Sequence, residues 1–96
     1  MDKKLKAKWV KALRSGKFKQ TRGTLFDGVS AYCCLGVLNV IGRGVKGHGV
    51  FGGGYSYAAQ KTGLRDGELS DLNDGVRGLI EPKSFKQIAT WIEKNL

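Results

Sequence analysis

Residues that could perform chemistry gather at a few places in the sequence, and the most familiar pattern is glycine-rich. Residues 42–47, Gly-Arg-Gly-Val-Lys-Gly, match the dinucleotide-binding pattern G-x-G-x-x-G, and Asp66 follows at a spacing that suits a ribose contact. The pattern binds a pyrophosphate only where a strand precedes it and a helix begins at it. Residues 48–52 are a poor start for that helix, and His48 stands where a P-loop has lysine. We therefore expect no dinucleotide site of this kind.

Nucleophilic catalysis would need a thiolate and a base. Cys33 or Cys34 with His48 offers both, and Asn73 or Asp74 would orient the imidazole. Both cysteines, however, lie in the most apolar run of the chain, where burial raises the pKa of a thiol and makes it unreactive. One histidine and two adjacent cysteines also fall short of the four ligands that zinc takes. We interpret the cysteines as core residues and predict neither a metal nor another cofactor.

The carboxylates of Asp71 and Asp74 are the remaining candidates for acid–base chemistry. Aspartates in turn-rich segments more often cap turns and short helices, and Asn73-Asp74-Gly75 is a typical turn sequence. Because nothing in these patterns requires catalysis, we predict a protein that is not an enzyme.

The strongest functional signal is the positive charge of the N-terminal quarter. Residues 1–22 hold nine lysines and arginines against one aspartate, and so supply +8 of the net charge of +9. Such asymmetry indicates an anionic partner, although a solubilising helix face would have the same composition. The candidate anion-binding residues offer a cation, a hydrogen-bond donor or close backbone approach: Arg14, Lys17, Lys19, Gln20, Thr21, Arg22 and Gly23.

Aromatic residues lie close to these cations in the sequence. Phe18 and Tyr32 could stack on a base. DNA, RNA, a free nucleotide and an acidic protein surface all suit the composition of this region. For a small nucleotide, we predict a pocket near Arg22 and Gly23 that also includes Asn73 and Asp74.

The first element that positions these residues is an amphipathic helix, capped by Asp2 and ending near Ser15. Its apolar stripe consists of Leu5, Trp9, Val10, Ala12 and Leu13. The opposite face is cationic, and its lysines Lys4, Lys8 and Lys11 extend the candidate anion site.

A β-hairpin should follow, with Asp27-Gly28 as a two-residue type I′ turn that pairs Phe26 with Val29. It leads into residues 31–41, an uncharged run that is apolar almost all round and is therefore predicted to be a buried helix. Gly36 is costly inside a helix, so we expect it to let another backbone come close.

The rest of the chain alternates irregular and helical segments. Seven of the thirteen residues 42–54 are glycine, which predicts a loop or an irregular ribbon. A short helix should cover residues 56–62, and a C-terminal amphipathic helix begins with the capping box Ser84 to Gln87. Together these elements predict one small α+β domain over residues 1–96: an N-terminal helix, a hairpin, a buried central helix, a glycine-rich segment and a C-terminal helix.

The sequence contains no apolar stretch long enough to cross a membrane and no apolar signal core behind its basic N-terminus. Two adjacent cysteines do not form a disulfide framework, which favours a reducing compartment. We therefore expect a cytoplasmic protein with no membrane partner.

Four segments, taken in order, resemble a group of small proteins carried by bacteriophages and prophages. They are residues 11–25 with Lys-Gln-x-Arg-Gly-x-Leu, residues 32–38 with Cys-Cys-Leu-Gly-Val-Leu, Leu72-Asn73-Asp74, and residues 84–89 with Ser-Phe-x-x-Ile-Ala. The glycine-rich part, residues 42–60, lies outside the resemblance. The resemblance implies a phage accessory protein in the bacterial cytoplasm, with a role against host defence among the options, and brings no catalytic or binding residue.

These observations favour non-enzymatic binding of nucleic acid or a phosphorylated ligand through the basic N-terminal quarter. Two alternatives stay open. One is an inhibitor that docks directly on a host defence protein, in the manner of an anti-CRISPR or another anti-defence protein. The other is a sponge that sequesters a nucleotide second messenger.

Overall fold

The described part of the chain is mostly helical, and its one sheet consists of two very short parallel strands. The computed structural model describes residues 1–65 and 67–96, and Asp66, the predicted ribose contact, lies outside them. The described elements, in chain order, are α1 (Lys3–Arg14), β1 (Lys19–Gln20), β2 (Ala31–Tyr32), α2 (Cys34–Arg43), the 3₁₀ turn η1 (Gly47–Phe51), α3 (Gly54–Thr62), α4 (Glu68–Asp74) and α5 (Phe85–Asn95). The predicted small α+β fold is confirmed.

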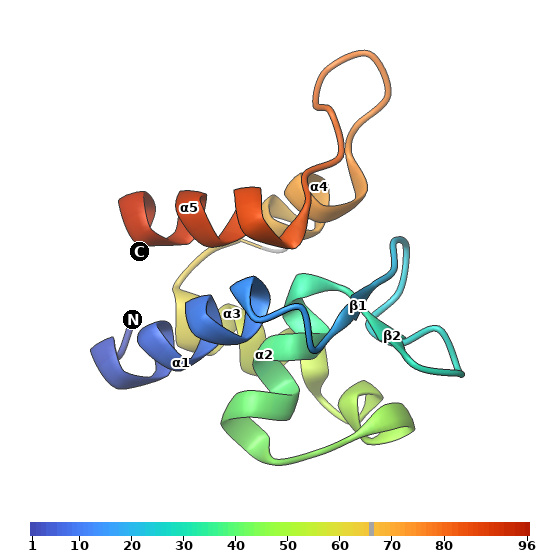
Figure 1. Ribbon diagram of the computed structural model, residues 1–96, viewed down its shortest axis with the longest axis vertical. Coiled ribbons are helices and arrows are strands. Elements are labelled where there is room, and N and C mark those ends of the chain that lie inside the picture. Colours follow the sequence, from blue (N-terminus) through green and yellow to red (C-terminus); the bar gives the residue numbers. More distant parts are fainter. Residues whose placement is uncertain (66) are drawn as a thin grey trace.

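Helices α1 and α5 lie side by side and run in opposite directions, so that both termini are at one end of the molecule (Figure 1). Their apolar stripes meet over α2 in a single core. Trp9 is fully buried there, and its indole N–H donates to the Cys34 carbonyl at 2.9 Å. Ile88 and Ile92 of α5 are also fully buried. Burial of such apolar faces supplies most of the free energy that holds amphipathic helices in place.

Both outer helices begin at the predicted caps. The Asp2 carboxylate accepts from the Leu5 N–H at 2.8 Å. At α5 the capping box is complete, because the Ser84 hydroxyl accepts from the Gln87 N–H and the Gln87 side chain accepts from the Ser84 N–H. Caps of this kind stabilise a helix by about 1 kcal/mol each.

The predicted buried helix is confirmed as α2, although residues 31 and 32 form β2 instead of its first turn. The expected close approach at Gly36 is also present. A Cβ atom at this position would lie 2.2 Å from the Leu25 carbonyl oxygen. That carbonyl in turn accepts from the Cys33 N–H at 3.2 Å, so Gly36 lets the chain around Leu25 lie directly on α2.

The predicted hairpin is wrong in both its turn and its register. Phe26 forms an isolated antiparallel bridge with Tyr32 and not with Val29, and β2 pairs in parallel with β1. The cause is the Asp27 carboxylate, which accepts from the N–H groups of Val29, Ser30 and Ala31 at 2.8–3.0 Å. These three bonds hold a wider loop than a two-residue turn, and they lower the pKa of Asp27, most strongly through the Ala31 bond.

The glycine-rich segment is more regular than its composition predicts. Residues 42 and 43 complete α2, Gly44 ends it in the left-handed conformation with φ of 71°, and η1 follows. Helix α3 begins at Gly54 and ends before Gly63, close to the predicted range. The predicted turn at Asn73-Asp74-Gly75 is instead the end of α4, and only Gly75 lies beyond the helix. None of the helices in the described residues combines the length and apolarity that crossing a membrane requires.

Candidate functional site

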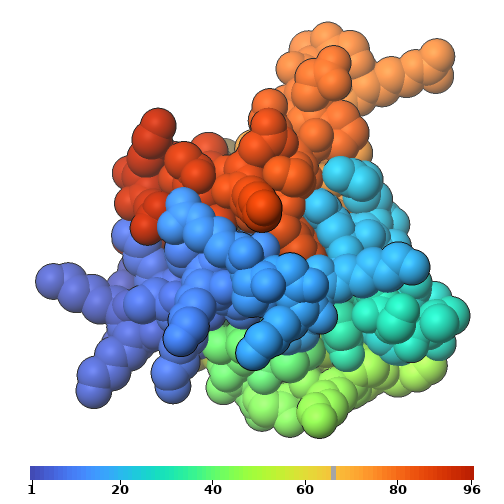
Figure 2. Space-filling view, viewed as in Figure 1, coloured from blue at the N-terminus to red at the C-terminus, as the bar shows by residue number. Residues whose placement is uncertain are grey.

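A row of lysines covers the outer face of α1, opposite its buried stripe. Lys4, Lys8 and Lys11 are exposed and follow the three- and four-residue spacing that places side chains on one face. Lys17 and Lys19 continue the exposed row past the C-terminus of α1. Figure 2 shows several long side chains of this N-terminal region, in blue, projecting into solvent on one side of the molecule. We call the five residues Lys4, Lys8, Lys11, Lys17 and Lys19 the lysine face.

Arg14 differs from these lysines because it has a carboxylate partner. Its guanidinium lies 2.5 Å from Glu93 of α5 and also donates to the Thr90 hydroxyl at 3.2 Å. The hydrogen bond from Arg14 lowers the pKa of Glu93. Within residues 1–65 and 67–96 this is the one ion pair between side chains. The predicted anion-binding role of Arg14 therefore competes with an internal partner.

A cleft lies beside the lysine face, between the end of α1 and α2. Its volume is about 320 Å³. Ala12, Phe18 and Ile41 give it an apolar floor, while Lys8, Lys11 and Lys17 stand at its edge. The cleft therefore combines apolar surface with three cations, which suits a ligand that has both a flat apolar part and negative charge.

The structure also brings together the residues of the predicted nucleotide pocket, around the buried side chain of Asn73. Its carbonyl oxygen accepts from the Gln20 amide at 2.9 Å and from the Cys34 N–H at 3.2 Å. Its amide donates to the Thr21 carbonyl at 2.9 Å and to the Asp74 carboxylate at 2.8 Å. All four hydrogen-bonding positions of this amide are used within the chain.

The neighbours of Asn73 are paired as well. Arg22 donates from Nε to the main-chain carbonyl of Asn73 at 2.9 Å, and the Gly23 N–H donates to the Asp74 carboxylate at 3.0 Å. The Gln20 amide also reaches the Lys83 carbonyl at 2.8 Å. Gln20, Thr21, Arg22, Gly23, Asn73 and Asp74 thus form one network that ties the N-terminal quarter to α4 and to the start of α5. The predicted pocket included four of these residues, Arg22, Gly23, Asn73 and Asp74, but the sequence did not indicate Asn73 as its centre.

The thiols have the environment expected of core residues. Cys33 is 4% exposed and Cys34 is fully buried, and desolvation raises the pKa of both. His48 is exposed on η1, with its ring against those of Phe26 and Phe51. The G-x-G-x-x-G motif begins in the last turn of α2 and ends at the first residue of η1, so it lacks the preceding strand and following helix that pyrophosphate binding needs. The described residues contain no group of three potential metal ligands.

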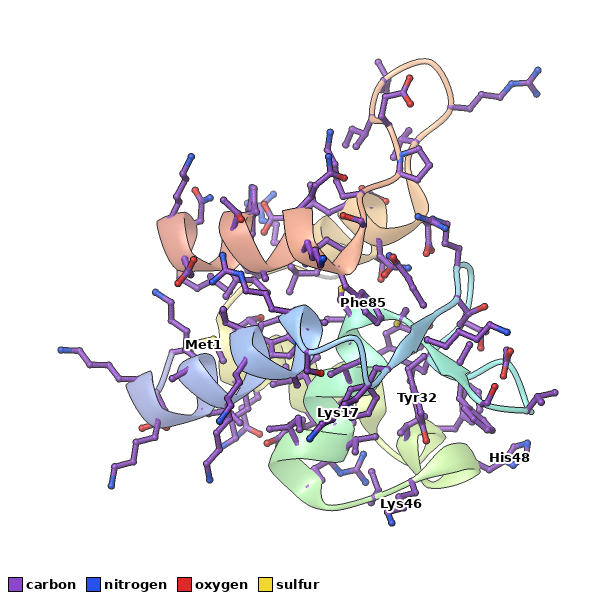
Figure 3. All side chains as sticks on the ribbon, in the orientation of Figure 1. Met1, Lys17, Tyr32, Lys46, His48 and Phe85 are labelled. Atoms are coloured by element: carbon purple, nitrogen blue, oxygen red, sulfur yellow. The ribbon has the colours of Figure 1, made fainter. Side chains whose placement is uncertain are left out.

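Phe18 and Tyr32, the predicted stacking residues, meet edge to face with ring centroids 5.9 Å apart. Both are half-buried. Figure 3 shows Lys17 near Tyr32, at the end of the molecule that also carries η1. The exposed cations and the stacking candidates therefore lie in the same region.

No curated protein matches this chain, and no solved structure matches it. The sequence model of a family described as a domain of unknown function, DUF8296, matches residues 1–50. The match covers slightly more than half of the 96 residues and includes α1, β1, β2 and α2 with the whole lysine face. The chain therefore belongs to the DUF8296 family.

Proposed function

We propose that this chain is a non-enzymatic accessory protein of a bacteriophage that binds an anionic partner, a nucleic acid or a phosphorylated ligand. Binding occurs at the lysine face and the adjoining cleft. The observation that carries the proposal is the exposure of five lysines on one side of the molecule without an internal acidic partner among the described residues.

The acidic groups near this region are already engaged elsewhere. Asp2 caps α1, Glu93 holds Arg14, and Asp74 belongs to the network around Asn73. Asp27 accepts three main-chain hydrogen bonds within its own loop, and the charge of Lys19 contributes to lowering its pKa. We therefore assign the main role to Lys8, Lys11 and Lys17, which surround the cleft, and a lesser one to Lys19.

The mechanism is charge neutralisation with release of counterions from the polyanion. Affinity should then fall steeply with salt, with a slope of log K against log salt of about −0.9 for each phosphate neutralised on duplex DNA. Fluorescence anisotropy with labelled DNA and RNA at several salt concentrations measures this slope. Affinity that does not change with ionic strength would overturn the proposal.

Site-specific variants separate a defined surface from the general effect of net charge. The triple variant K8Q/K11Q/K17Q removes three cations around the cleft, and K61Q/R65Q/R77Q removes three exposed cations that lie outside α1. We expect only the first variant to weaken binding strongly and to reduce the salt slope by about 2–3. Equal losses in both variants would mean that positive charge acts without a site.

One observation favours a second function, docking on a host defence protein. The loop formed by residues 76–80 is closed by the antiparallel bridge between Val76 and Ile80 and projects from the molecule (Figure 1). Leu79 at its tip is 85% exposed. A protein partner that covers this loop would bury the apolar side chain of Leu79 and gain free energy from doing so. A partner captured from nuclease-treated bacterial lysate that is lost with Leu79→Asp, but kept with K8Q/K11Q/K17Q, would favour this function over anion binding.

A further inference from the structure

A series of aromatic rings leads from the lysine cleft across β2 to η1. Phe18, which belongs to the floor of the cleft, meets Tyr32 at 5.9 Å between ring centroids. Tyr32 meets Phe26 at 5.0 Å, and Phe26 meets His48 at 5.2 Å. The series ends at Phe51, 6.1 Å from His48. These residues come from four separate segments, so only the fold brings them together.

The rings differ in exposure: the inner rings are buried or half-buried and support the outer rings, which are exposed to solvent. Phe26 is 8% exposed and lies between the rings of Tyr32 and His48. Tyr32 is held further by its hydroxyl, which accepts from the Gly47 N–H at 2.7 Å. His48 is exposed, and Phe51 is 46% exposed although it is a large apolar ring. The outer end of the series therefore offers ring surface to solvent on a fixed base.

Lysines lie beside the series of aromatic rings from one end to the other. Lys17 stands at the cleft, and Lys46 lies immediately before Gly47, whose N–H holds Tyr32. Figure 3 shows Lys17, Tyr32, Lys46 and His48 at the same end of the molecule. Lys19 of β1 pairs with Ala31 beside Tyr32, and the charge of Lys19 contributes to lowering the pKa of Asp27. Exposed rings next to lysines match the two halves of a nucleotide, the flat base and the phosphate.

We propose that this aromatic series binds single-stranded nucleic acid, with bases stacked on His48 and Phe51 and phosphates at Lys17, Lys19 and Lys46. The proposal rests on the proposed anion binding and names its partner. We favour single strands over duplexes because stacking on an exposed ring adds binding free energy only where the face of the base is free. In a duplex the base faces are covered by neighbouring base pairs.

The test compares single strands and duplexes of the same sequence, each about 12 nucleotides long, by fluorescence anisotropy at one salt concentration. We expect Phe51→Ala to weaken single-strand binding about 10-fold, because stacking on an aromatic ring contributes about 1–3 kcal/mol per base. Duplex affinity should stay unchanged. Phe51→Tyr should retain single-strand binding, whereas Phe51→Leu, which keeps an apolar side chain, should weaken it as much as Phe51→Ala does.

A matched control distinguishes the effect of losing a stacking ring from the effect of losing exposed apolar surface. Leu79→Ala removes an apolar side chain that is more exposed than Phe51 and lies on the distant 76–80 loop, and it should leave binding unchanged. Because Phe51 and His48 are both exposed, far-ultraviolet circular dichroism should show the variants folded like the parent protein.

The outcomes distinguish this inference from the proposed function. Equal affinity for single strands and duplexes, with no effect of Phe51→Ala, would overturn the single-strand inference and leave anion binding at the lysine face intact. Failure to bind any nucleic acid would overturn the inference, and loss of binding to every phosphorylated ligand as well would overturn the proposed function. A response to Phe51→Leu equal to that of Phe51→Tyr would also overturn stacking.

Discussion

Two buried positions show how single residues decide this fold. Gly36 lies where α2 meets the chain around Leu25, and Asn73 lies where the N-terminal quarter meets α4. At one position any side chain is excluded, and at the other one particular side chain is required. The role of Gly36 is therefore tested by adding a side chain, and the role of Asn73 by removing one.

We expect Gly36→Ala to destabilise the protein in spite of the better helix propensity of alanine. The added Cβ would lie 2.2 Å from the Leu25 carbonyl oxygen, and backbone on both sides must move to relieve the contact. Overpacking of this kind typically costs about 1–3 kcal/mol in the free energy of unfolding. Gly52→Ala is the control, because its Cβ would meet only the Gly49 carbonyl oxygen at 4.0 Å. Urea denaturation measures both, and equal stabilities would contradict the close approach.

Asn73→Ala should be similarly harmful for a different reason. The change leaves the Cys34 N–H and the Thr21 carbonyl without their partner, and the Gln20 amide keeps only the Lys83 carbonyl. Unsatisfied buried polar groups cost about 1–3 kcal/mol each, although water reaching the site offsets part of this. Asp71→Asn, an exposed change on the same helix, should alter the unfolding free energy by less than about 0.5 kcal/mol. An Asn73→Ala variant as stable as this control would show that the network does not hold the fold.

Among the elements, the loop between β1 and β2 gives the clearest dependence on pH. The N–H groups of Ala31, Val29 and Ser30 all bind the Asp27 carboxylate and lower its pKa below that of a free aspartate. A lowered native pKa means that folding favours the ionised form. The stabilisation is therefore fully present above the unfolded pKa of about 3.9 and is lost as the pH falls through the native pKa.

Asp27→Asn tests this sign, because asparagine keeps the side-chain shape and an oxygen acceptor but cannot ionise. We expect the variant to have a lower Tm than the parent protein at pH 7 and the two values to converge as the pH falls toward about 2. Thermal unfolding followed by circular dichroism over this range measures the difference. A difference in Tm that is the same at every pH would exclude the charge of Asp27 as the cause.

At the scale of the whole molecule, the sequence predicts well those elements that are determined by residues close together in the chain. Helices α1 and α5 have a local cap and a regular apolar stripe, and both form at the predicted residues. The pairing of β1 with β2 and the network around Asn73 join positions 12 to 53 residues apart, and no local pattern encodes them. The hairpin prediction failed because Asp27 bonds to three successive N–H groups instead of forming a tight turn.

The same distinction applies to the candidate site. Charge and helical period were enough to predict Lys4, Lys8 and Lys11 on one face, since both are read from nearby residues. The pairing of Arg14 with Glu93 spans 79 residues, and so no local pattern distinguishes Arg14 from the neighbouring lysines. Likewise His48 and Phe51 are connected to the rings of Tyr32 and Phe18 through Phe26, and only the path of η1 places them there.

The lysine face has a consequence for the stability of the whole molecule. Most of the net charge of +9 comes from one quarter of the chain, and like charges repel most in the compact native state. K8Q/K11Q/K17Q should therefore raise Tm at low salt while it weakens anion binding. At about 1 M salt, where the screening length falls to about 3 Å, the gain in Tm should disappear. Calorimetry at both salt concentrations measures it, with K61Q/R65Q/R77Q as the variant of equal charge change. A larger gain in Tm for K61Q/R65Q/R77Q would mean that charge repulsion is spread over the surface. A gain in Tm confined to K8Q/K11Q/K17Q would show that keeping these three lysines close together lowers the stability of the native state. A binding surface requires such a cost.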